Sequence, residues 1–124
     1  MCIHRKVSDW CHICRPINAL YYAIIRRHNL YFKGKKNHYE MMNIRDREEL
    51  YNYLSLKFYK SNPDLILSEC LHKKTHEIDH FLPIGKKLNG LYDINRCDRK
   101  NLNIVPRIVN RKKGGNIPLV ALHL

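Results

Sequence analysis

The sequence predicts an α+β protein in which N-terminal helices are followed by a strand, a long loop, a second strand and a final helix. Two observations lead to this prediction. Apolar side chains recur at helical spacing in the first half, and strand-like segments begin near residue 75. With 124 residues the chain is expected to form one compact domain, made of a basic helical region over 1–72 and a C-terminal unit over 73–124.

The first predicted helix covers residues 15–28. Pro16 suits its first turn, and an apolar stripe follows at helical spacing, formed by Ile17, Leu20, Tyr21, Ile24 and His28. Residues 29–42 are polar and basic and predict a loop or short hairpin. A second helix is expected over 46–60, with acidic residues near its start and lysines near its end. Asp64 would cap a short third helix that ends at Leu71.

The C-terminal unit begins with a predicted strand over 75–81. Residues 84–100 form a long polar connection in which Asn89-Gly90 is a strong turn signal. Leu102, Ile104 and Val105 indicate a second short strand. Pro106 would open the last helix, and Gly114-Gly115 would close it.

The charge of the chain indicates a polyanionic partner. There are 23 Lys and Arg residues against 11 Asp and Glu, a net charge of +12. The simplest such partner is nucleic acid, and the alternative is a solvated surface that keeps the protein soluble. No apolar run reaches the length of a membrane span, and the N-terminus lacks the apolar segment of a signal peptide. A soluble, cytoplasmic protein without membrane contact is therefore expected.

The five cysteines are odd in number and unevenly spaced, which favours reduced thiols over a disulfide framework. Cys11-His12-Ile13-Cys14 is a Cys-x-x-Cys pair that can bind zinc. A structural zinc site would consist of Cys2, His4, Cys11 and Cys14. The alternative is a set of reduced cysteines without metal.

Four residues of the C-terminal unit carry the chemistry needed to cut a phosphodiester bond. His80 can act as a base near neutral pH, and the adjacent Asp79 offers a carboxylate to a divalent cation. Asn110 offers a second oxygen ligand, and Asn101 can hold the histidine in place. Because adjacent residues of a regular strand point to opposite faces, Asp79 and His80 would need an irregular backbone to converge.

Asp79-His80-Phe81-Leu82-Pro83, followed by Asn101-Leu102 and then by Asn110 before basic residues and glycine, resembles the HNH endonuclease motif, also called the ββα-metal or His-Me finger. The resemblance covers roughly residues 75–115. It implies that His80 activates water, that Asn101 orients His80, and that Asp79 and Asn110 bind the metal ion. Basic residues of the final helix would contact phosphate: Arg107, Arg111, Lys112 and Lys113.

The final helix is expected to place Arg107, Asn110 and Lys113 on one face, with Ile108 and Val109 facing the strands. The chain departs from many relatives of the family in one respect. Its segment between the second strand and the helix contains no cysteine, which excludes a zinc knuckle there.

The resemblance implies a hydrolase that cuts DNA with one Mg²⁺ or Mn²⁺ ion, nicking one strand or cutting both as a homodimer. It also implies a phage or mobile-element origin and thus the host cytoplasm. Two alternatives remain open at this point. The chain could bind nucleic acid without cutting it, or it could be a nuclease directed at RNA.

Overall fold

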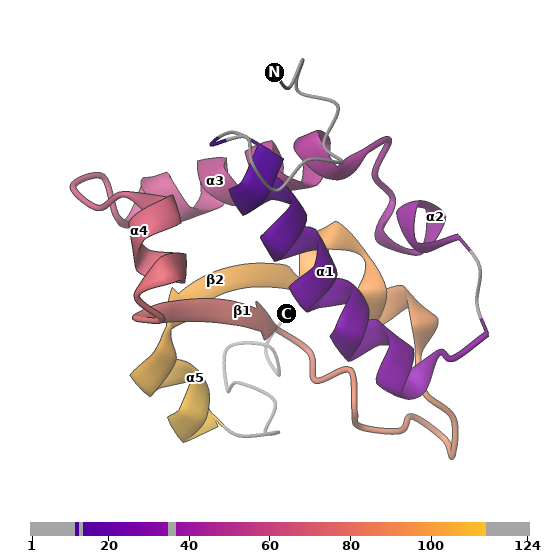
Figure 1. The fold of residues 1–124 in the computed structure, drawn as a ribbon. Helices are drawn as coiled ribbons and strands as arrows, with labels where there is room; N and C mark the ends of the chain where they lie inside the picture. The colour runs from indigo at the N-terminus through magenta and orange to yellow at the C-terminus, as the bar shows by residue number, and fades with distance from the viewer. Residues whose placement is uncertain (1–11, 13, 35–36, 114–124) are drawn as a thin grey trace.

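The computed structural model describes residue 12 and residues 14–34 and 37–113 (Figure 1). The fold is α+β, as predicted: helices surround a two-stranded antiparallel sheet. In chain order the elements are α1 (Cys14–Tyr31), α2 (His38–Met42), α3 (Arg47–Ser61), α4 (Leu67–His72), β1 (His76–His80), the 3-10 helices η1 (Ile94–Cys97) and η2 (Arg99–Asn101), β2 (Leu102–Pro106) and α5 (Arg107–Lys113).

The helices α1 and α3 form the main core together with the sheet. The predicted stripe of α1 is buried along its whole length and ends at His28. Helix α3 begins as predicted, because the side chain of Asp46 accepts a hydrogen bond from the Glu49 backbone N–H at 2.8 Å. The apolar face of α3, Leu50, Leu54 and Phe58, is buried in the same core as Leu102 and Ile104 of β2.

The sheet is a two-stranded ribbon whose two faces have different neighbours. Ile78 pairs with Ile104 and His80 with Leu102, so these side chains share one face, the face that packs on the core. Glu77 and Asp79 belong to the opposite face. In Figure 1, α3 and α5 lie on either side of the ribbon. Helix α5 contacts the beginning of β1, where the Arg107 backbone N–H donates to the Thr75 carbonyl, and the far end of β1, at His80, contacts α1.

Three of the predicted boundaries in the first part of the chain were wrong. Helix α1 continues to Tyr31, and α2 lies within the predicted loop or hairpin over 29–42. Helix α2 forms there because the Asn37 side chain accepts from the Glu40 backbone N–H at 3.0 Å. The third helix begins at Leu67 and its N-cap is Ile66, without a side-chain hydrogen bond, so Asp64 does not cap it.

The last helix also differs from its prediction. Pro106 is the final residue of β2, and α5 starts at Arg107; Gly114-Gly115 lies outside the described residues. Ile108 and Val109 are exposed at 69% and 53% and do not face the strands. The reason is that Asn110 contacts the ribbon, and on a helix the two preceding positions then point in other directions.

The connection between the strands is more ordered than a polar loop. Leu88 and Leu91 pair across the predicted turn, in which Asn89 and Gly90 have φ of 54° and 83°. Glycine suits that left-handed backbone because it has no Cβ. Farther along, Ile84 and Cys97 pack with Phe32 in a second small core. The loop is therefore fixed against the end of α1.

Within the described ranges, no helix combines the length and the apolar character needed to cross a membrane.

Candidate active site

A cleft of about 360 Å³ lies where α1, the end of β1, the following loop and α5 meet. Three of the four motif residues considered above, Asp79, His80 and Asn110, line it together. The complete lining is Arg27, Tyr31, Ile78, Asp79, His80, Pro83, Ile84, Gly85, Lys86 and Asn110.

Asp79 and His80 reach the same cleft without the irregular backbone that was predicted for them. The strand stays regular, with Asp79 opposite Asn103 and His80 opposite Leu102. Because His80 is the last residue of β1, the cleft opens at the end of the ribbon and receives side chains from both faces. The prediction of an irregular backbone at Asp79 and His80 was therefore wrong, but both residues do line one cleft.

His80 is buried at 6% exposure and contacts a histidine that the sequence analysis assigned to packing. The Nε2 atoms of His80 and His28 lie 2.9 Å apart, which is hydrogen-bond distance. The two rings meet edge to face, with centroids 5.1 Å apart. His28 has no exposed surface. Burial lowers the pKa of His28 from 6.5 to about 4, with smaller contributions from His38 and Arg27, so that His28 is neutral at physiological pH.

Asn101 holds the loop that directly follows His80. Its side-chain oxygen accepts from the Leu82 backbone N–H at 2.8 Å. Its Nδ2 donates to the carbonyl oxygens of Leu82 at 3.0 Å and Arg96 at 2.8 Å. The Phe81 backbone N–H also donates to the Asn101 carbonyl at 2.8 Å. These contacts fix the backbone on the C-terminal side of His80.

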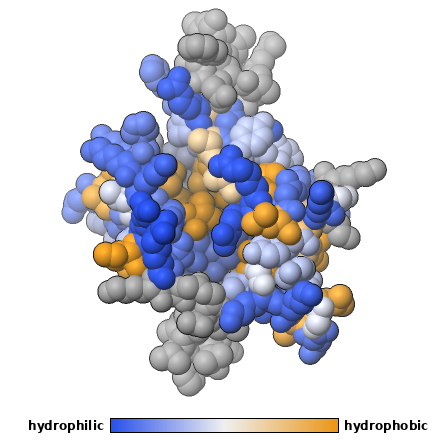
Figure 2. Space-filling model, turned by 60° about the horizontal axis from the view of Figure 1, so that its bottom comes forward, coloured by the Kyte–Doolittle hydropathy of each residue, from blue (hydrophilic) through white to orange (hydrophobic). Residues whose placement is uncertain are grey.

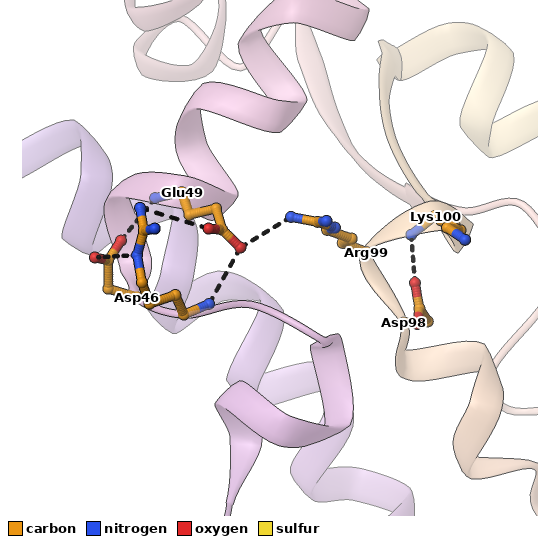
Figure 3. Close-up of polar contacts among 6 residues, drawn as sticks. Asp46, Glu49, Asp98, Arg99 and Lys100 are labelled. Atoms are coloured by element: carbon orange, nitrogen blue, oxygen red, sulfur yellow. Dashed lines mark hydrogen bonds and ion pairs between the residues drawn. The ribbon is translucent and has the colours of Figure 1, made fainter.

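The short helix η2, which carries Asn101, is tied to the start of α3 (Figure 3). Arg99 donates to the Glu49 carboxylate at 2.9 Å, and its guanidinium lies 5.0 Å from the centre of the Tyr53 ring. Asp98 caps η2 by accepting from the Lys100 backbone N–H at 2.9 Å. The position of Asn101 is therefore coupled to the helical core.

Asp79 and Asn110 offer oxygen atoms to the cleft from the sheet and from α5. The Nδ2 of Asn110 donates to Glu77 Oε1 at 2.9 Å, which commits the amide nitrogen and leaves Oδ1 as the acceptor for another group. A carboxylate and an amide oxygen are ligands that hard divalent cations such as Mg²⁺ prefer. Among the described residues, no group of three or more His, Cys, Asp or Glu side chains could hold a metal ion. Two protein oxygen ligands, from Asp79 and Asn110, fit a divalent cation whose other coordination positions are occupied by substrate and water.

The basic residues at the cleft are not those that the motif suggested. Arg27 and Lys86 line it, and both are exposed. On α5, Arg107 and Arg111 are exposed outside the cleft lining. The side chains of Lys112 and Lys113 lie outside the described part of the chain. Figure 2 turns the side with α5 and the loop forward, and hydrophilic residues there flank a central group of hydrophobic ones.

Three residues of α1 at or near the cleft were not predicted from the sequence: Arg27, His28 and Tyr31. The only signal was the place of His28 at the end of an apolar stripe, because a polar residue in such a stripe is unusual unless it has a buried partner. Nothing in the spacing linked α1 to residues more than forty positions later.

The candidate zinc site cannot be assembled from described residues, because Cys2, His4 and Cys11 lie outside them. Cys14 is the first residue of α1 and is buried. Cys70 and Cys97 are buried free thiols, as the cysteine pattern predicted. Burial, with a smaller effect of Asp93, raises the pKa of Cys97 to about 12.

Comparison of the chain with models of known protein families, with curated proteins and with solved structures gave no match.

Proposed function

We propose that the protein is a metal-dependent endonuclease of the HNH (ββα-metal) type that hydrolyses phosphodiester bonds in DNA. The observation that carries this proposal is the convergence of Asp79, His80 and Asn110 on one cleft, with Asn101 fixing the loop beside His80. The order of strand, loop, strand and helix supports it as well.

In the proposed reaction, His80 accepts a proton from the attacking water as the new P–O bond forms. The bond between phosphorus and the leaving oxygen breaks, and that oxygen takes a proton from solvent. Asp79 and Asn110 would hold one divalent ion, Mg²⁺ or Mn²⁺, which would supply positive charge beside the phosphate and the leaving oxygen. Asn101 keeps the backbone after His80 in place throughout.

Arg27 and Lys86 are the residues proposed to bind the phosphates next to the scissile bond, because both line the cleft. The net charge of +12 supports a polyanionic substrate. The exposed cations of α5, Arg107 and Arg111, with Lys112 and Lys113 on the same helix, would extend this contact along the backbone. One such site cuts one strand per engagement, so nicking is expected from a monomer and double-strand cutting from a dimer.

The test is nicking of supercoiled plasmid in Mg²⁺ or Mn²⁺, with EDTA as the metal-free control. His80→Ala is expected to lower the rate by about 10²–10⁴-fold, the usual contribution of a general base. Asp79→Ala should lower it through loss of metal binding. His72→Ala is the matched control, because His72 is an exposed histidine at the end of α4, and it should cut like the wild type.

The outcomes separate this proposal from its alternatives. Metal-dependent nicking that His80→Ala abolishes and His72→Ala preserves would support it. Tight, salt-sensitive plasmid binding without cleavage under either metal would refute the DNA nuclease. Repeating the assay with single-stranded RNA would then distinguish an RNA nuclease from a protein that only binds nucleic acid.

A further inference from the structure

Helix α1 brings to the cleft a tyrosine that has no place in the reaction as described so far. Tyr31 is the last residue of α1 and lines the cleft together with Arg27. Residues four apart lie on the same face of a helix, so both side chains approach the cleft from one side. Lys86 lines the cleft from the loop after β1, which runs past the end of α1 (Figure 1). One neutral and two cationic hydrogen-bond donors therefore share this cleft.

The ring of Tyr31 is held by packing, but its hydroxyl has no use in the described fold. The ring packs against the second small core and lies 4.9 Å from the ring of Tyr92, measured between centroids. Within the described ranges, the hydroxyl has no hydrogen-bond partner. Phenylalanine would pack in the same way, so the packing does not account for the hydroxyl group.

Gly85 leaves the space that the Tyr31 hydroxyl occupies. A Cβ at position 85 would lie 2.6 Å from the hydroxyl oxygen of Tyr31 and 2.9 Å from its Cζ. The backbone of Gly85 does not have a positive φ, so its conformation does not require glycine. What favours glycine here is the close approach of the phenol. Because Gly85 also lines the cleft, the hydroxyl end of Tyr31 lies at the cleft wall.

We propose that Tyr31 is a substrate-binding residue whose hydroxyl donates a hydrogen bond to a phosphate of the DNA backbone next to the scissile one. Arg27 and Lys86 neutralise the charge of the phosphates bound there. That the ligand is DNA rests on the proposed function.

The chemistry of the phenol fits a phosphate better than a base. Phosphate oxygens are acceptors, and a hydrogen bond to a charged acceptor is stronger than one between neutral groups. Tyrosine hydroxyls are among the groups that contact phosphates in protein–DNA complexes. A base would instead need an open ring face for stacking, whereas Tyr92 and the second small core already pack against the ring of Tyr31.

The experiment measures binding of a fluorescein-labelled DNA duplex by fluorescence anisotropy in EDTA, at several NaCl concentrations. Tyr31→Phe removes a single oxygen atom and should raise Kd about 10-fold, since hydrogen bonds to charged groups contribute at least that much. The slope of log Kd against log salt concentration should stay as in the wild type, because the phenol is neutral. The thermal unfolding midpoint should not change either, since the hydroxyl has no partner in the described fold.

Two further variants calibrate the comparison. Lys86→Gln should raise Kd and also lower the salt slope by about 0.9, the value for one phosphate contact on duplex DNA. Tyr53→Phe is the matched control, because it removes a hydroxyl from α3, outside the cleft lining, and it should bind like the wild type.

The role of the Tyr31 hydroxyl would be overturned by a Tyr31→Phe protein that binds the duplex like the wild type, or that loses no more affinity than Tyr53→Phe. A lower salt slope in Tyr31→Phe would also overturn it, because the loss would then come from displaced cations. A wild type that binds no duplex would refute this contact together with the proposed function. A wild type that binds the duplex but cuts no DNA would refute only the nuclease, and the binding comparison would still decide the contact.

Discussion

Acid should destabilise the protein through His28. This residue has no exposed surface, and burial lowers its pKa from 6.5 to about 4 in the folded state. The unfolded chain therefore binds a proton at this site more readily than the folded one. It follows that the stability is complete above about pH 6.5 and declines as the pH falls from there to about 4.

The magnitude follows from the difference between the two pKa values. At about pH 5 the unfolded His28 is almost fully protonated and the folded one is almost fully neutral. The free energy of unfolding should then be lower by about 2 kcal/mol than at about pH 7.5, and the limit at lower pH is about 3 kcal/mol. For a domain of this size either loss is a large fraction of the total stability.

Urea unfolding followed by circular dichroism at both pH values measures the effect, with His28→Leu and His72→Ala as comparisons. The loss specific to His28 is the part that His28→Leu removes, whereas the exposed His72→Ala should retain the wild-type difference. Parallel losses in wild type and His28→Leu would refute the assignment to His28, because both proteins share the other titrating groups apart from the altered contact with His80.

Three further predictions concern the loop and the cleft. Asn101→Ala removes three side-chain hydrogen bonds to backbone groups of Leu82 and Arg96 and should lower the free energy of unfolding in urea by about 1–3 kcal/mol. Asn52→Ala, at an exposed position of α3, is the control and should change the stability little. Equal losses in the two variants would contradict the role given to Asn101. Gly85→Ala would bring a Cβ to 2.6 Å from the Tyr31 hydroxyl oxygen. It should shift the Tyr31 ring resonances in NMR spectra with about 1 kcal/mol or less of destabilisation, and unchanged spectra would show that the ring does not sit there. Native Cys97 should resist alkylation near pH 8, as read by mass spectrometry, because it is buried and its pKa is raised to about 12; rapid labelling without unfolding would contradict this.

The helices and strands were predictable wherever a local pattern determined them. The stripe of α1, the start of α3 near its acidic residues, and both strands follow from local spacing and residue type. Helix α2 was missed because a polar, basic segment shows no apolar period, and its start depends on one Asn37 cap. The start of α4 was misplaced because its N-cap, Ile66, makes no side-chain hydrogen bond.

The candidate site was predictable only in its C-terminal part. Asp79, His80 and Asn110 were found because residue type and spacing point to their chemistry, and the structure brings them to one cleft. The contribution of α1 could not be found in this way, because Arg27 and His28 meet the cleft through tertiary packing across more than fifty residues of chain. The place of His28 in the apolar stripe of α1 indicates that this residue is buried, but the stripe does not indicate that it contacts His80.

The shared core has a consequence for how such a site can be inherited or transferred. A two-stranded ribbon is at best marginally stable in water on its own. Here its apolar face, with Leu102 and Ile104, is covered by helices that lie far earlier in the chain. A fragment from β1 to α5 would keep every motif residue and yet leave that face bare and His80 without His28. A segment that is to fold and keep this site in another protein must therefore include the helices that cover the ribbon, and the motif residues alone are not sufficient.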